Sequence, residues 1–284
     1  MSRALTRGHG YGLRVPHYPS FLENGAPGVD FVEAVTENFL GRGGRPRTVL
    51  ERVRRDVPVA LHGVSLSVGG VSPLNWDYLW ALRALCETIE PAIVSDHLCF
   101  GTWGAHYGHD LWPLPFTEEA LAHVVSRVTA VQDRLGRRLA LENVSSYVRF
   151  ADSQLSEWEF LAAIARQADC DILLDINNVY VSAHNHGFDA RRYLDAMPAE
   201  RIFQIHLAGH SEAGALLVDT HDHPVRDEVW DLYEHALSRL GPVSTLIEWD
   251  DRIPAFDELE REALRARAVL ERLFGSEPAA SERR

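Results

Sequence analysis

The sequence is poor in cysteine and has no long apolar segment. Its three cysteines, Cys86, Cys99 and Cys170, have the spacing of neither a disulfide framework nor a thiolate metal site. We expect them to be small buried side chains in a reducing cytoplasm. No run of about 18 apolar residues is present, which excludes an ordinary transmembrane helix. The first residues also lack the apolar centre of a cleavable signal, so the expected location is the cytoplasm, away from membranes.

Positive charge is also scarce, and nucleotide-binding motifs are absent. The chain has 28 Lys and Arg residues against 41 Asp and Glu residues, which gives a net charge of −13. This balance argues against a nucleic-acid-binding protein, because phosphates require a positive surface. No G-x-G-x-x-G or G-x-x-x-x-G-K-[ST] segment follows an expected strand, which excludes the common nucleotide-binding folds. Histidine, in contrast, is abundant, with 14 residues.

Short apolar runs alternate with amphipathic segments along the whole chain. The expected strands are residues 11–15, 29–35, 57–63, 92–98, 138–144, 171–177, 201–207 and 243–249. The expected helices include residues 73–89, 117–135, 153–168, 224–240 and 255–273. Strands that alternate with helices pair in parallel, and near-continuous apolar strands are buried on both faces.

Eight such units predict an α/β fold, a (β/α)8 TIM barrel, rather than an open doubly wound sheet. We expect this barrel to be a single domain over residues 1–274, because no linker divides the chain. The polar segment 275–284 is expected to be a disordered C-terminal tail.

Polar residues stand at the carboxyl ends of six successive strands, from the third to the eighth. They are His62, Asp96, His97, Glu142, Asn143, Asp175, Asn178, His206, Glu248 and Asp250, and the loop after the seventh strand adds Asp219 and His221. Active sites of such barrels form at the carboxyl ends of the strands, so these side chains should converge on one mouth. Imidazole and carboxylate together bind zinc, iron or manganese, and this many ligands indicates more than one ion.

Each of these residues taken alone also fits an ordinary structural role. His62 alone fits a core or loop residue, and Glu142 alone fits a strand-end carboxylate paired with Arg149. Their joint placement on six consecutive strands is what favours a functional site, since lone buried charges are costly unless paired or bound to metal. His184 and His186 follow the sixth strand closely enough to reach the mouth, and their role stays open.

Several segments resemble a known family. They are HGVSLSVGG, SDHLCF, LENVSSY, LLDINNVYVSAHNHGFD, QIHLAGH, DTHDHPV and LIEWD. Over about residues 8 to 270 they are similar to the domain-of-unknown-function 692 family, the MbnB- and TglH-like multinuclear non-haem iron enzymes. This resemblance implies a xylose-isomerase-like barrel. The order of the ligands resembles, more distantly, that of endonuclease IV, a three-metal phosphodiesterase on the same fold.

The resemblance implies two ions that share one carboxylate, and a third, weaker position. The first ion would be bound by His62, His97 and Glu142, and the second by Glu142, Asp175, His206 and Glu248. The third position would contain Asp219 and His221, with Asn178 where the endonuclease pattern has a histidine. An amide oxygen is a weaker ligand than imidazole, so we expect a labile third ion. This difference also argues against phosphodiesterase chemistry.

The resemblance also implies a reaction. Members of the family use dioxygen and mixed-valence Fe(II)/Fe(III) ions to modify a cysteine or nearby residue of a ribosomally made precursor peptide. They commonly act with a partner protein that binds the peptide leader. The expected activity is therefore that of an iron- and dioxygen-dependent oxidase or oxygenase acting on a Cys or a C-terminal residue of such a peptide. Whether the protein binds two ions or three remains open.

Two other functions compete with this interpretation. The first is a metal-dependent hydrolase or isomerase, because His and carboxylate ligands suit zinc nearly as well as iron. The second is a binding module with structural metals. It is disfavoured because structural sites are closed and often contain cysteine, whereas this site is open and has none.

Five further roles are assigned at the mouth. The expected substrate-binding residues are Arg14, Glu37, Asn38 and Asn143. Arg14 could hold a peptide carboxylate through a bidentate pair. Asp250 lies two residues beyond Glu248, so period-two geometry points both side chains to the same side. Asp250 is thus a candidate general base, and the alternative is a rim carboxylate paired with Arg252.

Overall fold

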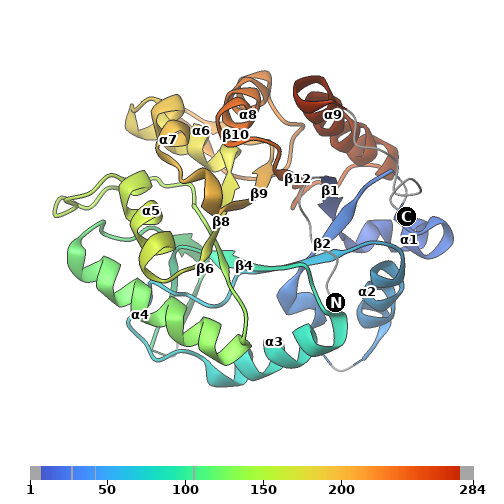
Figure 1. Cartoon of the computed structure of the whole chain (residues 1–284), viewed down its shortest axis with the longest axis horizontal. Helices are drawn as coiled ribbons and strands as arrows, with labels where there is room; N and C mark the ends of the chain where they lie inside the picture. Colours follow the sequence, from blue (N-terminus) through green and yellow to red (C-terminus); the bar gives the residue numbers. More distant parts are fainter. Residues whose placement is uncertain (1–7, 27, 42, 105, 276–284) are drawn as a thin grey trace.

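The computed structural model describes residues 8–26, 28–41, 43–104 and 106–275. The tail expected to be disordered, residues 275–284, lies outside these ranges except for Gly275. Eight parallel strands close into a barrel in the order β1-β12-β9-β8-β7-β4-β3-β2, and helices surround it (Figure 1). The predicted α/β fold, a (β/α)8 TIM barrel, is confirmed.

The barrel strands correspond one to one with the eight expected strands. They are β1 (His9–Gly12), β2 (Phe31–Val35), β3 (Val59–Gly63), β4 (Ile93–His97), β7 (Ala140–Glu142), β8 (Asp171–Asp175), β9 (Ile202–Leu207) and β12 (Ser244–Ile247). Two antiparallel hairpins, β5 (Phe100–Trp103) with β6 (His106–Trp112) and β10 (Ser211–Ala213) with β11 (Leu216–Val218), were not among the expected strands. Because they follow the carboxyl ends of β4 and β9, they stand at the barrel mouth.

Helices follow the strands around the outside of the barrel (Figure 1). They are α1 (Tyr18–Asn24), α2 (Arg45–Asp56), α3 (Trp76–Ile89), α4 (Glu118–Leu135), α5 (Glu157–Gln167), α6 (Ile176–His186), α7 (Ala190–Ala196), α8 (Asp227–Leu240) and α9 (Phe256–Phe274), with 3-10 turns η1 (Val15–His17), η2 (Thr36–Phe39) and η3 (Ala199–Arg201). Within the described ranges, none of them is long and apolar enough to cross a bilayer. The three cysteines are buried and form no disulfide, as their spacing predicted.

Helix α4 illustrates how the amphipathic segments become helices. The Thr117 hydroxyl accepts a hydrogen bond from the Ala120 N–H at its start, and Gly136 ends it at a φ of 68°. Between these caps, apolar residues recur every three or four positions and are buried: Leu121, Val124, Val128, Val131 and Leu135. Packing of such a stripe supplies most of the stability of a helix in a protein.

Several strand boundaries differ from the expected ones, and two of these differences have clear local causes. Strand β1 ends at Gly12 rather than at residue 15, because Pro16 opens the turn η1 and leaves Arg14 outside the sheet. Strand β8 ends at Asp175 rather than at residue 177. Its carboxylate Oδ1 accepts the Asn178 N–H at 2.5 Å and starts helix α6 there. The asparagines after Asp175 therefore belong to the first turn of a helix.

Period-two alternation divides the barrel interior into an apolar and a polar layer. The apolar layer consists of Phe31, Ala60, Ile93, Ala140, Leu173 and Leu246. Two residues further along the chain, on the same inward face, stand the buried polar side chains Glu33, His62, Ser95, Glu142, Asp175 and Glu248. The ligand-type residues thus rest on an apolar floor that closes the barrel beneath them.

Candidate metal centre

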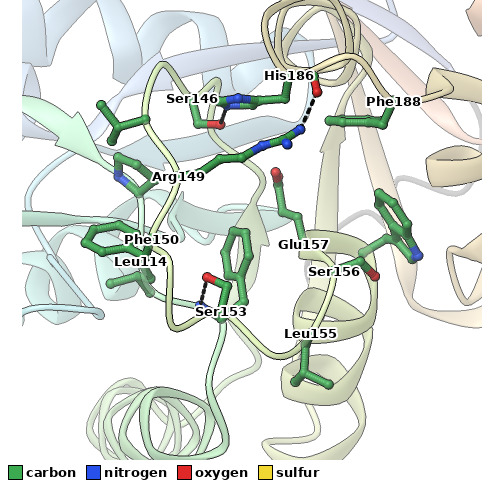
Figure 2. A pocket seen from close by; sticks show the side chains of 14 residues that line it. Leu114, Ser146, Arg149, Phe150, Ser153, Leu155, Ser156, Glu157, His186 and Phe188 are labelled. Atoms are coloured by element: carbon green, nitrogen blue, oxygen red, sulfur yellow. Dashed lines mark hydrogen bonds between the residues drawn. The ribbon is translucent and has the colours of Figure 1, made fainter.

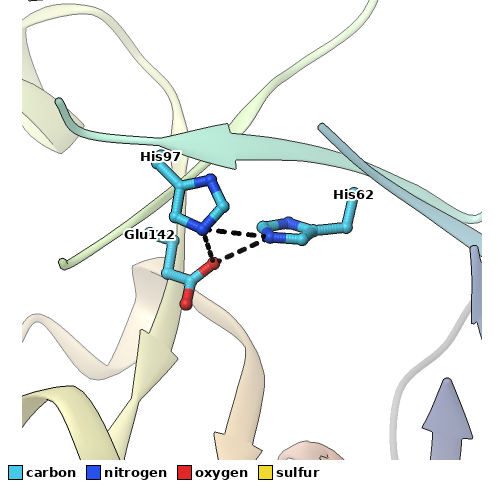
Figure 3. Close-up of side chains that lie close together, drawn as sticks. All are labelled: His62, His97 and Glu142. Carbon is cyan, nitrogen blue, oxygen red and sulfur yellow. Dashed lines mark hydrogen bonds and ion pairs between the residues drawn. The ribbon is translucent and has the colours of Figure 1, made fainter. Parts of the chain in front are cut away.

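His62, His97 and Glu142 form a compact buried triangle at the ends of β3, β4 and β7 (Figure 3). Glu142 Oε2 lies 3.1 Å from His62 Nε2 and 3.3 Å from His97 Nε2, and the two imidazole nitrogens are 3.3 Å apart. On their other nitrogens, His62 contacts the Ser95 hydroxyl at 2.8 Å and His97 contacts the Gly63 carbonyl at 3.0 Å. Because a carbonyl only accepts, His97 Nδ1 carries the proton and Nε2 is free to bind a metal ion.

The electrostatics of the triangle follow from its burial. Burial alone lowers the pKa of a histidine, but the Glu142 carboxylate outweighs it and raises the pKa of His62 to about 9. At His97 burial prevails, and the pKa lies below its ordinary value. The carboxylate of Glu142 is therefore stabilised as an anion by positive charge beside it. A metal ion at this point would replace the His62 proton in that role.

A second group of potential ligands lies next to the triangle and shares Glu142. It comprises Glu142, Asp175, His206 and Glu248, whose ligand atoms lie within 4.8 Å of one another. His206 Nδ1 is 2.9 Å from Glu248 Oε2 and 3.9 Å from Glu142 Oε1. Glu142 therefore directs Oε2 to one group and Oε1 to the other. This is the geometry that a bridging carboxylate requires.

His221 lies between further acidic side chains, as expected of a third position. Its Nε2 is 2.7 Å from Asp219 Oδ1, and its Nδ1 is 3.2 Å from Asp250 Oδ2 and 3.4 Å from Glu248 Oε2. His221 also adopts a φ of 46°, which is uncommon for a residue other than glycine. His221, Glu248 and Asp250 together form another potential ligand group, so Asp250 stands closer to this position than the sequence implied.

Four buried polar atoms in these groups make no ordinary hydrogen bond: Glu142 Oε2, Asp175 Oδ2, Asn178 Oδ1 and His221 Nε2. Glu142 Oε2 and His221 Nε2 still make ion-pair contacts, with His62 and Asp219. Asp175 Oδ2 and Asn178 Oδ1 are left unsatisfied, which costs about 1–3 kcal/mol for each atom and is unusual for two atoms of one site. All four belong to atom types that coordinate transition metals. The donor set therefore fits metal ions, and it borders a cavity of about 410 Å³ that opens at the mouth.

Arg14 and Asp250, the expected substrate-binding and proton-transfer residues, contact each other. The Arg14 guanidinium pairs with Asp250, donates to the Trp249 carbonyl at 2.9 Å and lies 3.7 Å from Glu248 Oε1. Burial favours the protonated form of Asp250, but Arg14 and then His221 outweigh it and hold its pKa well below the usual range. Arg252 pairs with Asp222 at 3.5 Å, so the alternative Asp250–Arg252 pair is not formed.

The other three residues expected to bind substrate are placed differently. Asn143 is buried, and its amide donates to the Asp175 carbonyl at 2.9 Å and accepts from the Asp175 N–H at 3.0 Å. Glu37 accepts hydrogen bonds from the Val64 N–H and the Tyr78 hydroxyl, and Asn38 is exposed. None of the three is among the residues that line the 410 Å³ cavity. Their side chains therefore do not join the residues at the mouth.

Sequence reasoning missed several residues that support the ligands. Asn177 donates to Asp219 Oδ1 at 2.7 Å and contacts His210 Nδ1 at 2.8 Å, which orients Asp219. Glu33 and Gln204 contact His206 from within the barrel. The sequence did contain a signal for Glu33, because this carboxylate follows Phe31 by two residues within a buried strand.

The two undecided histidines lie at the far end of α6. His184 contacts the Ala215 carbonyl at 3.2 Å, and His186 contacts the Ser146 hydroxyl at 2.7 Å. His186 lines a second, largely apolar cavity of about 330 Å³ between the β7–α5 loop and α6, into which the carboxyl of Glu157 points (Figure 2). Arg149 donates to the His186 carbonyl there, so the alternative Glu142–Arg149 pair is not formed. Neither histidine belongs to a ligand group of the described residues.

Solved structures with a similar fold include an endonuclease and several epimerases. Endonuclease IV from Thermus thermophilus superposes with a TM-score of 0.60 at 18% identity, covering 93% of this chain and 99% of that one. A D-psicose 3-epimerase in the presence of D-fructose superposes with a TM-score of 0.59 at 11% identity, covering 95% and 100%. At these identities the likeness establishes the fold, a xylose-isomerase-like barrel, and no more.

Sequence comparison gives the family. A UPF0276 protein of Anaeromyxobacter sp. is 60% identical over 269 residues, which cover 94% of this chain and 95% of that protein. A UPF0276 protein of Caulobacter vibrioides is 53% identical over 261 residues, with 92% and 93% covered. The family model described as RiPP precursor modification enzyme MbnB/TglH/ChrH matches residues 8–271, where RiPP denotes a ribosomally synthesised and post-translationally modified peptide. The chain, with its shared-carboxylate ligand groups at the barrel mouth, belongs to this family.

Proposed function

We propose that this protein is an iron- and dioxygen-dependent oxidase or oxygenase that modifies one residue, a Cys or a C-terminal residue, of a ribosomally made precursor peptide. The observation that carries the proposal is Glu142, whose two oxygens face two different ligand groups beside an open cavity. Membership of a family of precursor-modifying enzymes supports the peptide substrate. The mixture of imidazole and carboxylate ligands suits iron that cycles between oxidation states.

Each group of residues would have its own task. His62, His97 and Glu142 would hold one ion, Asp175, His206 and Glu248 the second, and Asp219, His221 and Asn178 a labile third. Iron bound there would supply dioxygen activation and a Lewis-acid site for a substrate thiolate or carboxylate. The apolar floor of the barrel would keep water away from the ions from below.

Asp250 is the proposed proton acceptor. Arg14 and His221 fix its position beside Glu248 at the edge of the cavity. Both neighbours lower its pKa and hold it as a weak base. A metal ion bound at His221 would take the place of the His221 proton as the positive neighbour, so Asp250 would stay ionised and available to accept a proton.

The surface around the mouth suits a peptide and a partner protein. Exposed aromatic residues gather on the β5–β6 hairpin and on the β7–α5 loop: Trp103, Tyr107, Trp112, Tyr147 and Phe150. Aromatic side chains dominate the energetics of peptide and protein interfaces. Tyr107 and Leu111 also line the 410 Å³ cavity, so a peptide bound along the hairpin would reach the ligands. We propose that the precursor, and a leader-binding partner, dock here.

The test requires the cognate precursor, which we expect to be encoded by a short cysteine- or aspartate-bearing open reading frame near the gene. Iron-loaded protein, the precursor and any leader-binding partner are mixed with and without dioxygen. Mass spectrometry should show a mass change of the peptide only when both iron and dioxygen are present. The zinc-loaded protein is assayed in parallel for cleavage of DNA with an abasic site. An untouched peptide together with robust DNA cleavage would favour the hydrolase instead.

A further inference from the structure

One buried carboxylate beside the metal centre has no place in the ligand set. Glu33 lies in the middle of β2 and is 2% exposed. Its Oε2 lies 3.1 Å from His206 Nε2 and accepts a hydrogen bond from Gln204 Nε2 at 2.6 Å. A carboxylate at this depth costs several kcal/mol unless its partners compensate. A hydrophobic side chain would fill the same space, so the carboxylate requires a reason.

His206 meets carboxylates on both ring nitrogens. Nδ1 faces Glu248 at 2.9 Å and Glu142 at 3.9 Å, whereas Nε2 faces Glu33. A metal ion binds a ring nitrogen that carries no proton, so Nδ1 can serve as a ligand only when the proton of the neutral ring is on Nε2. In that tautomer the Nε2–H donates to Glu33. Without the metal, the opposite tautomer is available too, because Gln204 Nε2 lies 2.9 Å from His206 Nε2 and Nδ1–H can donate to Glu248.

The two imidazoles of the first metal position have neutral partners on their outer nitrogens. His62 contacts the Ser95 hydroxyl, and His97 contacts the Gly63 carbonyl. Among these three histidines of the described chain, only His206 has a carboxylate in this place. A carboxylate accepts a charge-assisted hydrogen bond and makes the imidazole a stronger ligand than a neutral acceptor does.

We propose that Glu33 is a positioning residue for the second metal position: it holds His206 in the tautomer that leaves Nδ1 free, and its charge strengthens His206 as a ligand. This inference rests on the proposed metal centre. It predicts that the two main positions respond differently to the loss of the Glu33 charge. The position of His62 and His97 should change much less than that of His206, because Glu33 contacts His206 directly and acts on His62 only through its charge. The position of His206 should weaken by about 10- to 100-fold, the usual range for such a carboxylate.

The experiment compares metal binding by three proteins. Metal-free wild type, Glu33→Gln and Glu37→Gln are titrated with Zn²⁺, and in a parallel series with Co²⁺, whose visible bands report each coordination site. Glu37→Gln is the matched control, because Glu37 is a carboxylate just beyond the same strand whose side chain contacts Val64 and Tyr78 instead of the centre. We expect Glu33→Gln to keep one ion at close to wild-type affinity and to bind the other about 10- to 100-fold more weakly. Only one of the two sets of Co²⁺ bands should change, and Glu37→Gln should match wild type.

The outcomes separate this inference from the proposed function. A folded Glu33→Gln protein that binds both ions with wild-type affinity would overturn the role of Glu33 and leave the metal centre standing. A wild-type protein that binds no ion would overturn the centre itself. Circular dichroism of the metal-free proteins establishes whether each variant folds. If Glu33→Gln does not fold, Glu33→Asp is used, since it keeps the charge but withdraws the carboxylate by one methylene. The same selective loss is expected, and unaltered binding by Glu33→Asp would also refute the role.

Discussion

Glu142 is the residue on which the ligand groups depend most, because each of its oxygens faces a different group. Most of its neighbours serve one group, so their loss would leave the other intact. Its Oε2 atom is buried between His62 and His97, and a metal ion there would supply the positive charge that a buried carboxylate requires. The bridging role that the resemblance implies for Glu142 stays a prediction, and metal content tests it.

Glu142→Ala should therefore lose more metal than a substitution at any single terminal ligand. Wild type prepared anaerobically from iron-replete cells is expected to contain about two ions per chain, mostly iron. Glu142→Ala should fall well below one ion, whereas His97→Ala should retain the ion held by His206. Element analysis of the purified proteins measures this. Full occupancy in Glu142→Ala would defeat the assignment of the bridge.

Asp250 differs from Glu142, because two assignments compete for it. If Asp250 is the proton acceptor, Asp250→Asn should keep its metals. Turnover of the precursor peptide should then slow by about 10²-fold or more, the usual cost of losing one proton-transfer group. If Asp250 is instead a ligand at the position of His221, Asp250→Asn should lose metal and activity together. Metal content and turnover number, measured on the same preparation, distinguish the two. A variant with full metal and unchanged turnover would exclude both.

Among the elements, the strands were predictable and the insertions were not. The eight strands are continuous apolar runs, and His, Asp and Glu residues follow at their carboxyl ends. The apolar pattern and the place of these residues were therefore enough to predict most of the candidate site. The hairpin β5–β6 was missed because its strand Phe100–Trp103 is only four residues long and partly exposed. Helix α6 was missed because its first turn, with Asn177 and Asn178, is polar and follows β8 without a loop.

Tertiary pairing is what sequence could not supply at the site. Nothing in the local sequence indicates that Asn143 forms hydrogen bonds with the backbone of Asp175. Nor does it indicate that Arg14 contacts Asp250, 236 residues away. Asn143 and Arg14 were therefore assigned to substrate binding, because each lies near the carboxyl end of an expected strand. Long-range hydrogen bonds depend on which strands become neighbours in the closed barrel, and side-chain periodicity does not specify them.

Helix α5 offers a prediction independent of the metals. Its first residue, Glu157, accepts a hydrogen bond from the Tyr193 hydroxyl at 3.0 Å, and burial raises its pKa from 4.5 to about 7. Between these two pH values the folded chain binds a proton that the unfolded chain has released, so stability falls as pH rises through this window. Glu157→Gln should remove that loss and stabilise the protein at pH 8 by about 1–2 kcal/mol, less than the full shift implies because the side chain is only half-buried.

Urea denaturation at pH 5 and pH 8 measures the effect on the free energy of unfolding. Glu118→Gln is the matched control, because Glu118 occupies the same first position of α4 but is exposed. We expect Glu157→Gln to be more stable than wild type at pH 8 and close to it at pH 5, with no such pH dependence in Glu118→Gln. Equal differences from wild type at both pH values would show that Glu157 does not titrate in this window.

At the scale of the whole molecule, negative charge is concentrated at one end of the barrel. The chain carries a net charge of −13, and six carboxylates of the described residues gather around His206 and His221: Glu33, Glu142, Asp175, Asp219, Glu248 and Asp250. Like charges at this spacing repel one another in a medium of low dielectric constant. At Asp175, burial first and then the neighbouring carboxylates Glu142 and Asp219 raise the pKa well above its ordinary value. Metal cations would neutralise this cluster and bind only the folded barrel.

Removal of metal should therefore destabilise the entire barrel, because the ligands come from β3, β4, β7, β8, β9 and the segment after β12. An ion present at 100 times its dissociation constant stabilises the folded state by about 2.7 kcal/mol. Scanning calorimetry at pH 7 should show a melting temperature that falls on treatment with a chelator and recovers when Zn²⁺ or Fe²⁺ is added. Glu142→Gln removes the shared ligand while conserving shape, so its melting temperature should respond far less to metal. If wild type loses its metals to the chelator, as element analysis would show, and still melts at the same temperature, the ions do not hold the strands together.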